Sequence, residues 1–120
     1  MISAALFDLA RLGLGGLLAT VGIAFLCGGA IGVLRFPDFY TRIHAASVIA
    51  GVGACLVIAA LAVTAADLAL ALRLGLLGAL IAVLNPTLTH VAASAAHAAG
   101  LAPLAGRYTV PRPGAAERQP

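Results

Sequence analysis

Three long stretches of this sequence carry no Asp, Glu, Lys or Arg, and they limit what the chain can fold into. These stretches are residues 12–34, 43–66 and 74–97. A helix of that length rises about 1.5 Å per residue and is about 35 Å long, enough to cross the hydrocarbon core of a bilayer. Only 9% of the residues are charged and 62% are hydrophobic, which leaves too few charges to cover a soluble domain. The sequence therefore predicts an all-α integral membrane protein with three transmembrane helices.

The two ends of the chain differ from the charge-free stretches. Residues 1–11 include Asp8 and Arg11 and predict a short amphipathic lead-in rather than a secretory signal, because no basic leader precedes the apolar residues. Residues 101–120 mix proline, glycine and arginine without an apolar period, which predicts a flexible polar tail. We therefore expect a three-span domain over residues 1–100, followed by this tail.

Small residues recur along the first two spans. Gly28 and Gly32 form a GxxxG pair in the first span, and Ala46 and Ala50 lie four residues apart in the second. In lipid such residues let neighbouring helix backbones approach closely. We expect these positions to pack helices together, either within the chain or against another chain, and the sequence leaves both alternatives open.

The cysteines and the remaining polar residues give no sign of a cofactor. Cys27 and Cys55 both lie inside apolar stretches, where cysteine usually acts as a small hydrophobic residue. No spacing of Cys, His, Asp and Glu is typical of a metal site, and no motif for nucleophilic or phosphate chemistry is present. We expect no metal, no cofactor and no enzymatic activity. We also expect no nucleic-acid partner, because the basic residues lie at span ends and not along one face.

The segment from Arg35 to His44 separates the first two spans and gathers charged, aromatic and proline residues. Pro37 is expected to end or bend the first helix, because it lacks an N–H and clashes with the preceding turn. Asp38 and Arg42 lie four residues apart, so they would face the same way and could pair if a helix restarts after the proline.

Two interpretations of this hinge remain open. Phe36, Phe39 and Tyr40 suit the headgroup region, which favours an interfacial turn with aromatic anchors. The variety of ionisable groups favours a charged cluster that docks a partner or conducts ions. The members of that cluster would be Arg35, Asp38, Arg42 and His44.

The third span carries polar residues near its middle. Asn85 lies about 17 Å from the start of the span at about 1.5 Å per residue, close to the bilayer centre. Pro86 cannot donate to the carbonyl of Ala82, so we expect a kink, with Asn85 and Pro86 as the helix break. One helical stripe after the break consists of Pro86, His90, Ser94 and His97. His90 is either an ordinary interfacial hydrogen-bonding residue or part of a functional site.

The positions of the arginines set the expected orientation. The arginines on the side of the hinge and the tail are Arg35, Arg42, Arg107, Arg112 and Arg118. Only Arg11 and Arg73 lie on the other side. Under the positive-inside rule, the hinge and the C-terminus are cytoplasmic and the N-terminus is outside. His44 and His90 then both lie toward the cytoplasmic face, where they could meet near Asp38.

The centre of the predicted membrane region holds no ionisable residue. Asp8, Asp38 and Asp67 lie at or beyond span ends, and Glu117 lies in the tail. An ion carrier usually keeps an ionisable group near the bilayer centre. We therefore expect this chain to be one part of a larger membrane assembly rather than a complete transporter.

The hinge and its flanks also carry a sequence motif. Its residues here are Gly32, Arg35, Phe36, Pro37, Asp38, Tyr40, Arg42, His44, Ala45 and Ala46. This run closely resembles the pattern of the G subunit of the Mrp-type multisubunit Na+/H+ antiporters, a family of small three-span proteins. A weaker similarity to the same family is a proline four residues before a histidine in the last span, here Pro86 and His90.

The resemblance implies a subunit of a hetero-oligomeric antiporter in the bacterial plasma membrane, which exchanges cytoplasmic Na+ or another monovalent cation for external H+. Its partners would be the other subunits and the lipid bilayer, and its role would be in assembly and in lining part of the cation path. The candidate functional residues are Arg35, Pro37, Asp38, Tyr40, Arg42, His44 and His90. Two alternatives remain open: a stand-alone oligomeric ion channel or transporter, and a purely structural assembly protein.

Overall fold

The computed structural model describes residues 2–101, 103 and 104. Its elements are α1 (Ile2–Arg35), α2 (Phe39–Val48), η1 (Ile49–Gly53), α3 (Ala54–Val63) and α4 (Leu68–Ala98). The element η1 is a π-helical turn, so α2, η1 and α3 form one continuous second span, Phe39–Val63. The three spans are long and apolar enough to cross a membrane, which confirms the predicted fold class. Most of the predicted tail, residues 101–120, lies outside the described residues.

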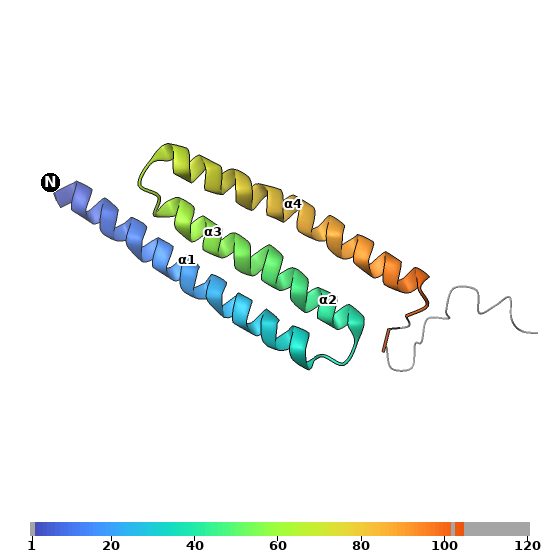
Figure 1. Ribbon diagram of the computed structural model, residues 1–120. Coiled ribbons are helices and arrows are strands. Elements are labelled where there is room, and N and C mark those ends of the chain that lie inside the picture. The colour runs from blue at the N-terminus through green and yellow to red at the C-terminus, as the bar shows by residue number, and fades with distance from the viewer. Residues whose placement is uncertain (1, 102, 105–120) are drawn as a thin grey trace, which may run out of the picture.

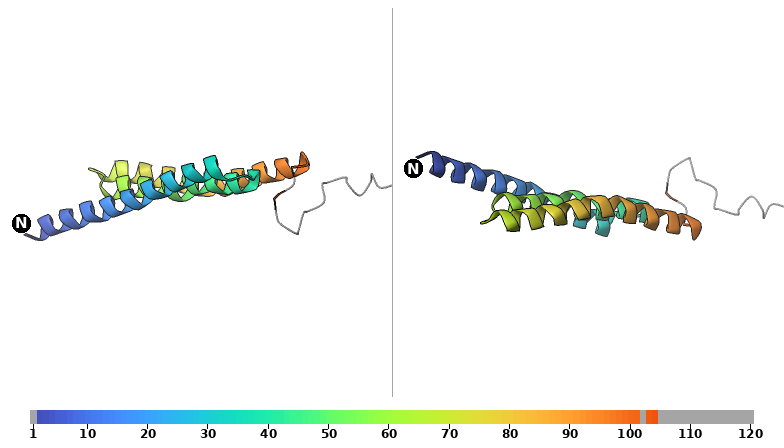
Figure 2. Two further views of the ribbon diagram at one scale, coloured as in Figure 1. Left: turned by 90° about the horizontal axis from the view of Figure 1, so that it is seen from below. Right: turned by 90° about the horizontal axis from the view of Figure 1, so that it is seen from above.

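The second span lies between the other two, so the helices form an open row rather than a closed bundle (Figure 1). The middle helix α3 packs against both α1 and α4, whereas the described residues of α1 and α4 make no contact with each other. Viewed from below and from above, the row is thin (Figure 2). Each broad face of the row is therefore open to lipid or to another chain.

Glycines of α1 let the second span approach closely. Gly15, Gly22 and Gly29 are buried and recur every seven residues. A Cβ atom at Gly22 would lie 2.9 Å from Val57 Cγ2 and 3.1 Å from the Gly53 carbonyl oxygen, closer than ordinary contact distance. The buried hydrophobic residues of the described chain are Ala45, Ala60, Ala65 and Ala96. Backbones thus pack through small residues, as expected where lipid supplies no hydrophobic force between helices.

Of the four predicted small-residue positions, only Gly32 is buried. A Cβ atom there would lie 3.0 Å from Ala45 Cβ. A Cβ atom at Gly28 would meet nothing within 4 Å, and Ala46 and Ala50 are exposed. These three positions do not serve close packing within the chain, which leaves packing against another chain as the prediction for them.

The first helix is longer than predicted. It begins at Ile2, so the expected lead-in of residues 1–11 is continuous with the first span. The N-terminal end of α1 projects past the loop between α3 and α4 (Figure 1). Arg11 marks the level of that loop, because its Nε donates to the Val63 carbonyl at 3.0 Å and its Nη2 to the Ala65 carbonyl at 2.7 Å. The end of α3 is thereby fixed against α1.

The fourth helix begins at an N-cap residue and contains Pro86. The N-cap residue Asp67 accepts a hydrogen bond from the Leu70 N–H at 2.7 Å. Pro86 lies inside the helix, and helical geometry continues on both sides of it. Among the described helices, the one π-helical turn is η1 in the second span, where the Ala54 N–H donates to the Ile49 carbonyl five residues back.

The C-terminal end of α4 is held by a Schellman motif. Gly100 has a φ of 83°, the Leu101 N–H donates to the Ala96 carbonyl at 3.1 Å, and the Gly100 N–H donates to the His97 carbonyl at 3.0 Å. The Tyr40 hydroxyl then donates to the Leu101 carbonyl at 2.9 Å. The hinge and the exit of α4 therefore lie at the same end of the row.

Candidate functional site

The hinge between α1 and α2 is held by backbone hydrogen bonds and by Arg42. Arg42 Nε donates to the Phe36 carbonyl at 2.6 Å. The Arg42 N–H and the Thr41 hydroxyl both donate to the Asp38 carbonyl, at 3.0 and 2.8 Å. No ion pair forms between Asp38 and Arg42 or elsewhere among the described residues, so the structure does not show the pairing that their spacing allows. The guanidinium is instead turned toward the backbone in front of Pro37.

The other predicted residues of the hinge are exposed or half-buried. Arg35 is the last residue of α1, and both it and Pro37 are exposed. Asp38 is the N-cap residue of α2, but its carboxylate accepts no capping hydrogen bond. Tyr40 is half-buried through its contact with the end of α4. The charges at this end of the row are therefore presented to the surroundings.

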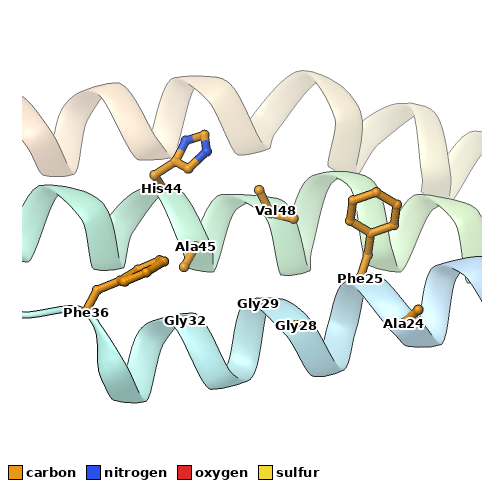
Figure 3. Close-up of a pocket in the computed structure, with 9 residues that line it drawn as sticks. All are labelled: Ala24, Phe25, Gly28, Gly29, Gly32, Phe36, His44, Ala45 and Val48. Atoms are coloured by element: carbon orange, nitrogen blue, oxygen red, sulfur yellow. The ribbon is translucent and has the colours of Figure 1, made fainter.

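His44 lies at one end of an apolar groove of about 350 Å³. Figure 3 shows the groove residues of α1 lying alongside those of α2, with Phe36 and Phe25 near opposite ends of the groove. The residues that line the groove include Phe25, Gly28, Gly29, Gly32, Phe36 and His44. Among the described residues that line this groove, His44 has the one ionisable side chain.

His90 lies on α4 and lines a different hollow, of about 590 Å³. Ser94 and His97 line the same hollow, so three members of the predicted stripe do lie together. His44 and His90 share the end of the row that carries the hinge, but neither hollow contains both residues. The two histidines therefore line separate hollows, although their helices α2 and α4 are in contact.

A polar contact joins the second span to the middle of α4. Asn85 Nδ2 donates to the Ser47 carbonyl at 3.0 Å. A Cβ atom at Gly51 would lie 2.6 Å from Asn85 Nδ2, so the glycine makes room for the amide. Gly51 belongs to the π-helical turn η1, a feature that often marks functional positions in helices. The Thr89 hydroxyl donates to the Asn85 carbonyl at 2.8 Å.

At the opposite end of the row, Arg11 is a structural residue that the sequence did not reveal. It lines a hollow of about 310 Å³ together with Asp8, Thr64 and Ala65. Its guanidinium meets carbonyls at the C-terminal end of α3, where the partial negative charge of a helix lies. A lone arginine at the edge of a charge-free stretch was the available signal, but its partner lies more than fifty residues away along the chain.

Comparisons with known proteins agree with this architecture. Residues 18–97 match the PhaG_MnhG_YufB family, described as Na+/H+ antiporter subunit. A UPF0091 protein of Rickettsia conorii is 44% identical over 77 residues, which cover 64% of this chain and 73% of the relative. A UPF0091 protein of Pyrococcus horikoshii is 37% identical over 82 residues, covering 68% of this chain and 80% of the relative.

Two solved structures share the fold. A chain in the Mrp complex from Dietzia sp. aligns with a TM-score of 0.76 and 33% identity, covering 84% of this chain and 92% of that chain. A chain of the membrane-bound sulfane sulfur reductase, an archaeal respiratory membrane complex, aligns with a TM-score of 0.74 and 26% identity, covering 88% and 97%. The family match spans most of the three helices, and the chain accordingly belongs to the family of small Na+/H+ antiporter subunits.

Proposed function

We propose that this subunit supports the assembly of a multisubunit Na+/H+ antiporter and lines part of its cation path, while companion subunits carry the ionisable groups of the proton path. The observation that carries this proposal is the polarity of the spans. The chain has no ionisable side chain in residues 12–34, 45–66 or 74–89, apart from the two cysteine thiols. Among the described side chains, the Asn85 amide and the Cys55 thiol make the hydrogen bonds that join the second span to α4. Proton transfer through a membrane needs titratable groups within the spans.

The open row supports a role in assembly. A helix row with two uncovered faces has more lipid-facing surface than a closed bundle, and a Cβ atom added at Gly13, Gly16 or Gly28 of α1 would meet nothing within 4 Å. Helix faces that carry such exposed glycines allow close contact with other helices. Ion transport itself requires the ionisable groups of the companion subunits, and we propose no enzymatic role for this chain.

We propose that the N-terminus lies outside and that the hinge and the C-terminus lie in the cytoplasm of a bacterial cell. The arginine distribution supports this orientation, with Arg35 and Arg42 at the hinge end. The Tyr40–Leu101 hydrogen bond supports a common side for the hinge and the exit of α4. Labelling of single cysteines by an impermeant maleimide tests the proposal: a cysteine at Asp38 should react only after the cells are opened, and a cysteine at Asp67 should react in intact cells. The reverse pattern contradicts it.

His90 and the hinge charges are the proposed contacts with the cation path. The complex containing His90→Ala should assemble fully but show reduced antiport or a displaced pH profile in membrane vesicles. His97→Ala, in the same hollow and nearer the end of α4, is the matched control and should change antiport less. Unchanged antiport with full assembly would leave a purely structural role for this end of the chain.

Two measurements separate this proposal from its alternatives. The tagged chain, purified in mild detergent, should bring down larger membrane proteins of the complex. Liposomes that contain the chain alone should show no Na+/H+ exchange. Recovery of the chain as a lone oligomer that catalyses cation flux would favour the stand-alone channel or transporter instead.

A further inference from the structure

The side-chain oxygen of Asn85, Oδ1, has no hydrogen-bond partner among the described residues. The nitrogen of the same amide, Nδ2, donates a hydrogen bond to the Ser47 carbonyl at 3.0 Å. The oxygen Oδ1 accepts no hydrogen bond from any described residue, although a side-chain amide oxygen has two lone pairs to offer. No buried side-chain nitrogen or oxygen of the described chain lacks a partner, so Oδ1 must be reachable from outside the chain.

The depth of this oxygen makes its exposure costly. Asn85 lies about 26 Å from the start of α4 at Leu68 and about 20 Å from its end at Ala98, at about 1.5 Å per residue. Its partner Ser47 lies about 12 Å from the start of the second span at Phe39, so the amide lies inside both spans rather than at their ends. A polar group in hydrocarbon strongly favours a hydrogen-bond partner. Acyl chains have no donor to provide one.

The surface around Asn85 is shaped to admit another helix. A groove of about 280 Å³ runs between the second span and α4 at this level, lined by Ala50, Ala54, Ile81, Leu84, Asn85 and Leu88. The alanines on the side of the second span offer a low surface on which a helix backbone can come close. The lone polar group among these residues is Asn85, so the groove combines apolar contact with one hydrogen-bond acceptor.

We propose that this groove is the seat of a transmembrane helix from a companion subunit, and that the helix donates a hydrogen bond to Asn85 Oδ1 from a hydroxyl, amide or ammonium side chain. The inference rests on the proposed role in a multisubunit antiporter and specifies where one contact lies and what chemistry it uses. Asn85 lines the groove and its Nδ2 is already bonded to the Ser47 carbonyl, so Oδ1 is the amide atom left to accept a hydrogen bond from a helix seated there. Gly51 leaves room for the amide.

Photocrosslinking in the intact complex tests the inference. A diazirine analogue of leucine replaces Leu88, which lines the groove and is 65% exposed. The matched control carries the analogue at Val83, which is 69% exposed and lies five residues earlier, about 140° away around the helix. We expect the Leu88 probe to form an adduct with a membrane-spanning segment of a companion subunit, at a position within one helical turn of a donor side chain.

Asn85→Leu, which keeps the size of the side chain and removes its polar atoms, supplies the second readout. The yield of the Leu88 adduct should fall at least fivefold, while the yield at Val83 should change less than twofold and report that the chain remains in the complex. An adduct with lipid only, with a second copy of this chain, or with a companion segment that has no donor at that depth would overturn the inference. So would an unchanged Leu88 yield in Asn85→Leu.

The experiment also separates this inference from the proposed function. If companion subunits purify with the chain but the Leu88 probe does not reach them, the assembly role stands and the groove assignment fails. If no companion purifies with the chain, the assembly role itself fails, and the groove assignment fails with it.

Discussion

The Tyr40 hydroxyl donates a hydrogen bond to the Leu101 carbonyl across 2.9 Å, which joins the start of the second span to the residue that completes the Schellman motif of α4. The two residues lie sixty-one positions apart along the chain. This contact fixes the exit of the last helix against the hinge, so the polar end of the row is a single surface rather than two independent ends.

Tyr40→Phe should lower the stability of the solubilised protein by about 0.5–1.5 kcal/mol, the usual net contribution of one hydrogen bond. The thermal unfolding midpoint of the purified protein in detergent measures this change. Thr87→Val is the matched control, because the Thr87 hydroxyl donates only to the Val83 carbonyl within its own helix. Equal unfolding midpoints for Tyr40→Phe and the wild type would show that the Tyr40–Leu101 hydrogen bond does not stabilise the protein.

Arg11→Met should cost about 1.5–3 kcal/mol, because it leaves the Val63 and Ala65 carbonyls without their charged donor. Arg11→Lys should recover only part of the loss, since an ammonium cannot reproduce the two-pronged geometry of a guanidinium. Chemical unfolding in mixed micelles provides the measurement. Arg73→Met is the control, as Arg73 donates no hydrogen bond to another described residue. Full recovery by lysine would show that charge alone matters.

Gly22→Val should destabilise the chain by about 1–3 kcal/mol, because the added side chain would collide with Val57 and the Gly53 carbonyl. Gly13→Val should leave the stability of the isolated chain unchanged, since a Cβ atom there meets nothing within 4 Å. Unfolding of the two variants in detergent gives the comparison. A similar loss for both would mean that glycine substitution weakens α1 regardless of the contact.

Reversal of both hinge charges, Asp38→Arg with Arg42→Asp, should not restore what the single Arg42→Asp change loses. The structure gives Arg42 the Phe36 carbonyl as its partner, and an aspartate at position 42 cannot donate to it. The coupling energy of the double-mutant cycle should lie within about 0.5 kcal/mol of zero. Assembly of the complex is the quantity to measure, and clear recovery in the double variant would re-establish an ion pair.

The number and nature of the spans could be predicted from sequence because absence of charge over bilayer-length stretches leaves few other folds. The motif from Gly32 to Ala46 was sufficient to predict the family. The open row could not be predicted, since three equally apolar spans give no signal for which pairs touch. The partner of Arg42 was missed because helical spacing shows which side chains face the same way, but not that the backbone before Pro37 has a carbonyl free to compete for the guanidinium.

The contact between Asn85 and Ser47 also lay beyond sequence reasoning. The sequence indicated a polar residue at mid-depth in the third span, but its partner is the Ser47 carbonyl of α2, and room for the amide comes from Gly51 in the neighbouring π-helical turn. Pro86 lies inside α4, and the π-helical turn lies in the second span. A π-helical turn contains one more residue than an α-helical turn, and a uniformly apolar sequence does not indicate where that residue is added.

The absence of contact between α1 and α4 has a consequence for how the protein is made. Every pairing of spans joins segments that follow one another along the chain, so the hairpin of the first two spans can close while the third is still being synthesised. The contacts between the first two spans can therefore form before the third span is made, and they need not rearrange when it packs against the second.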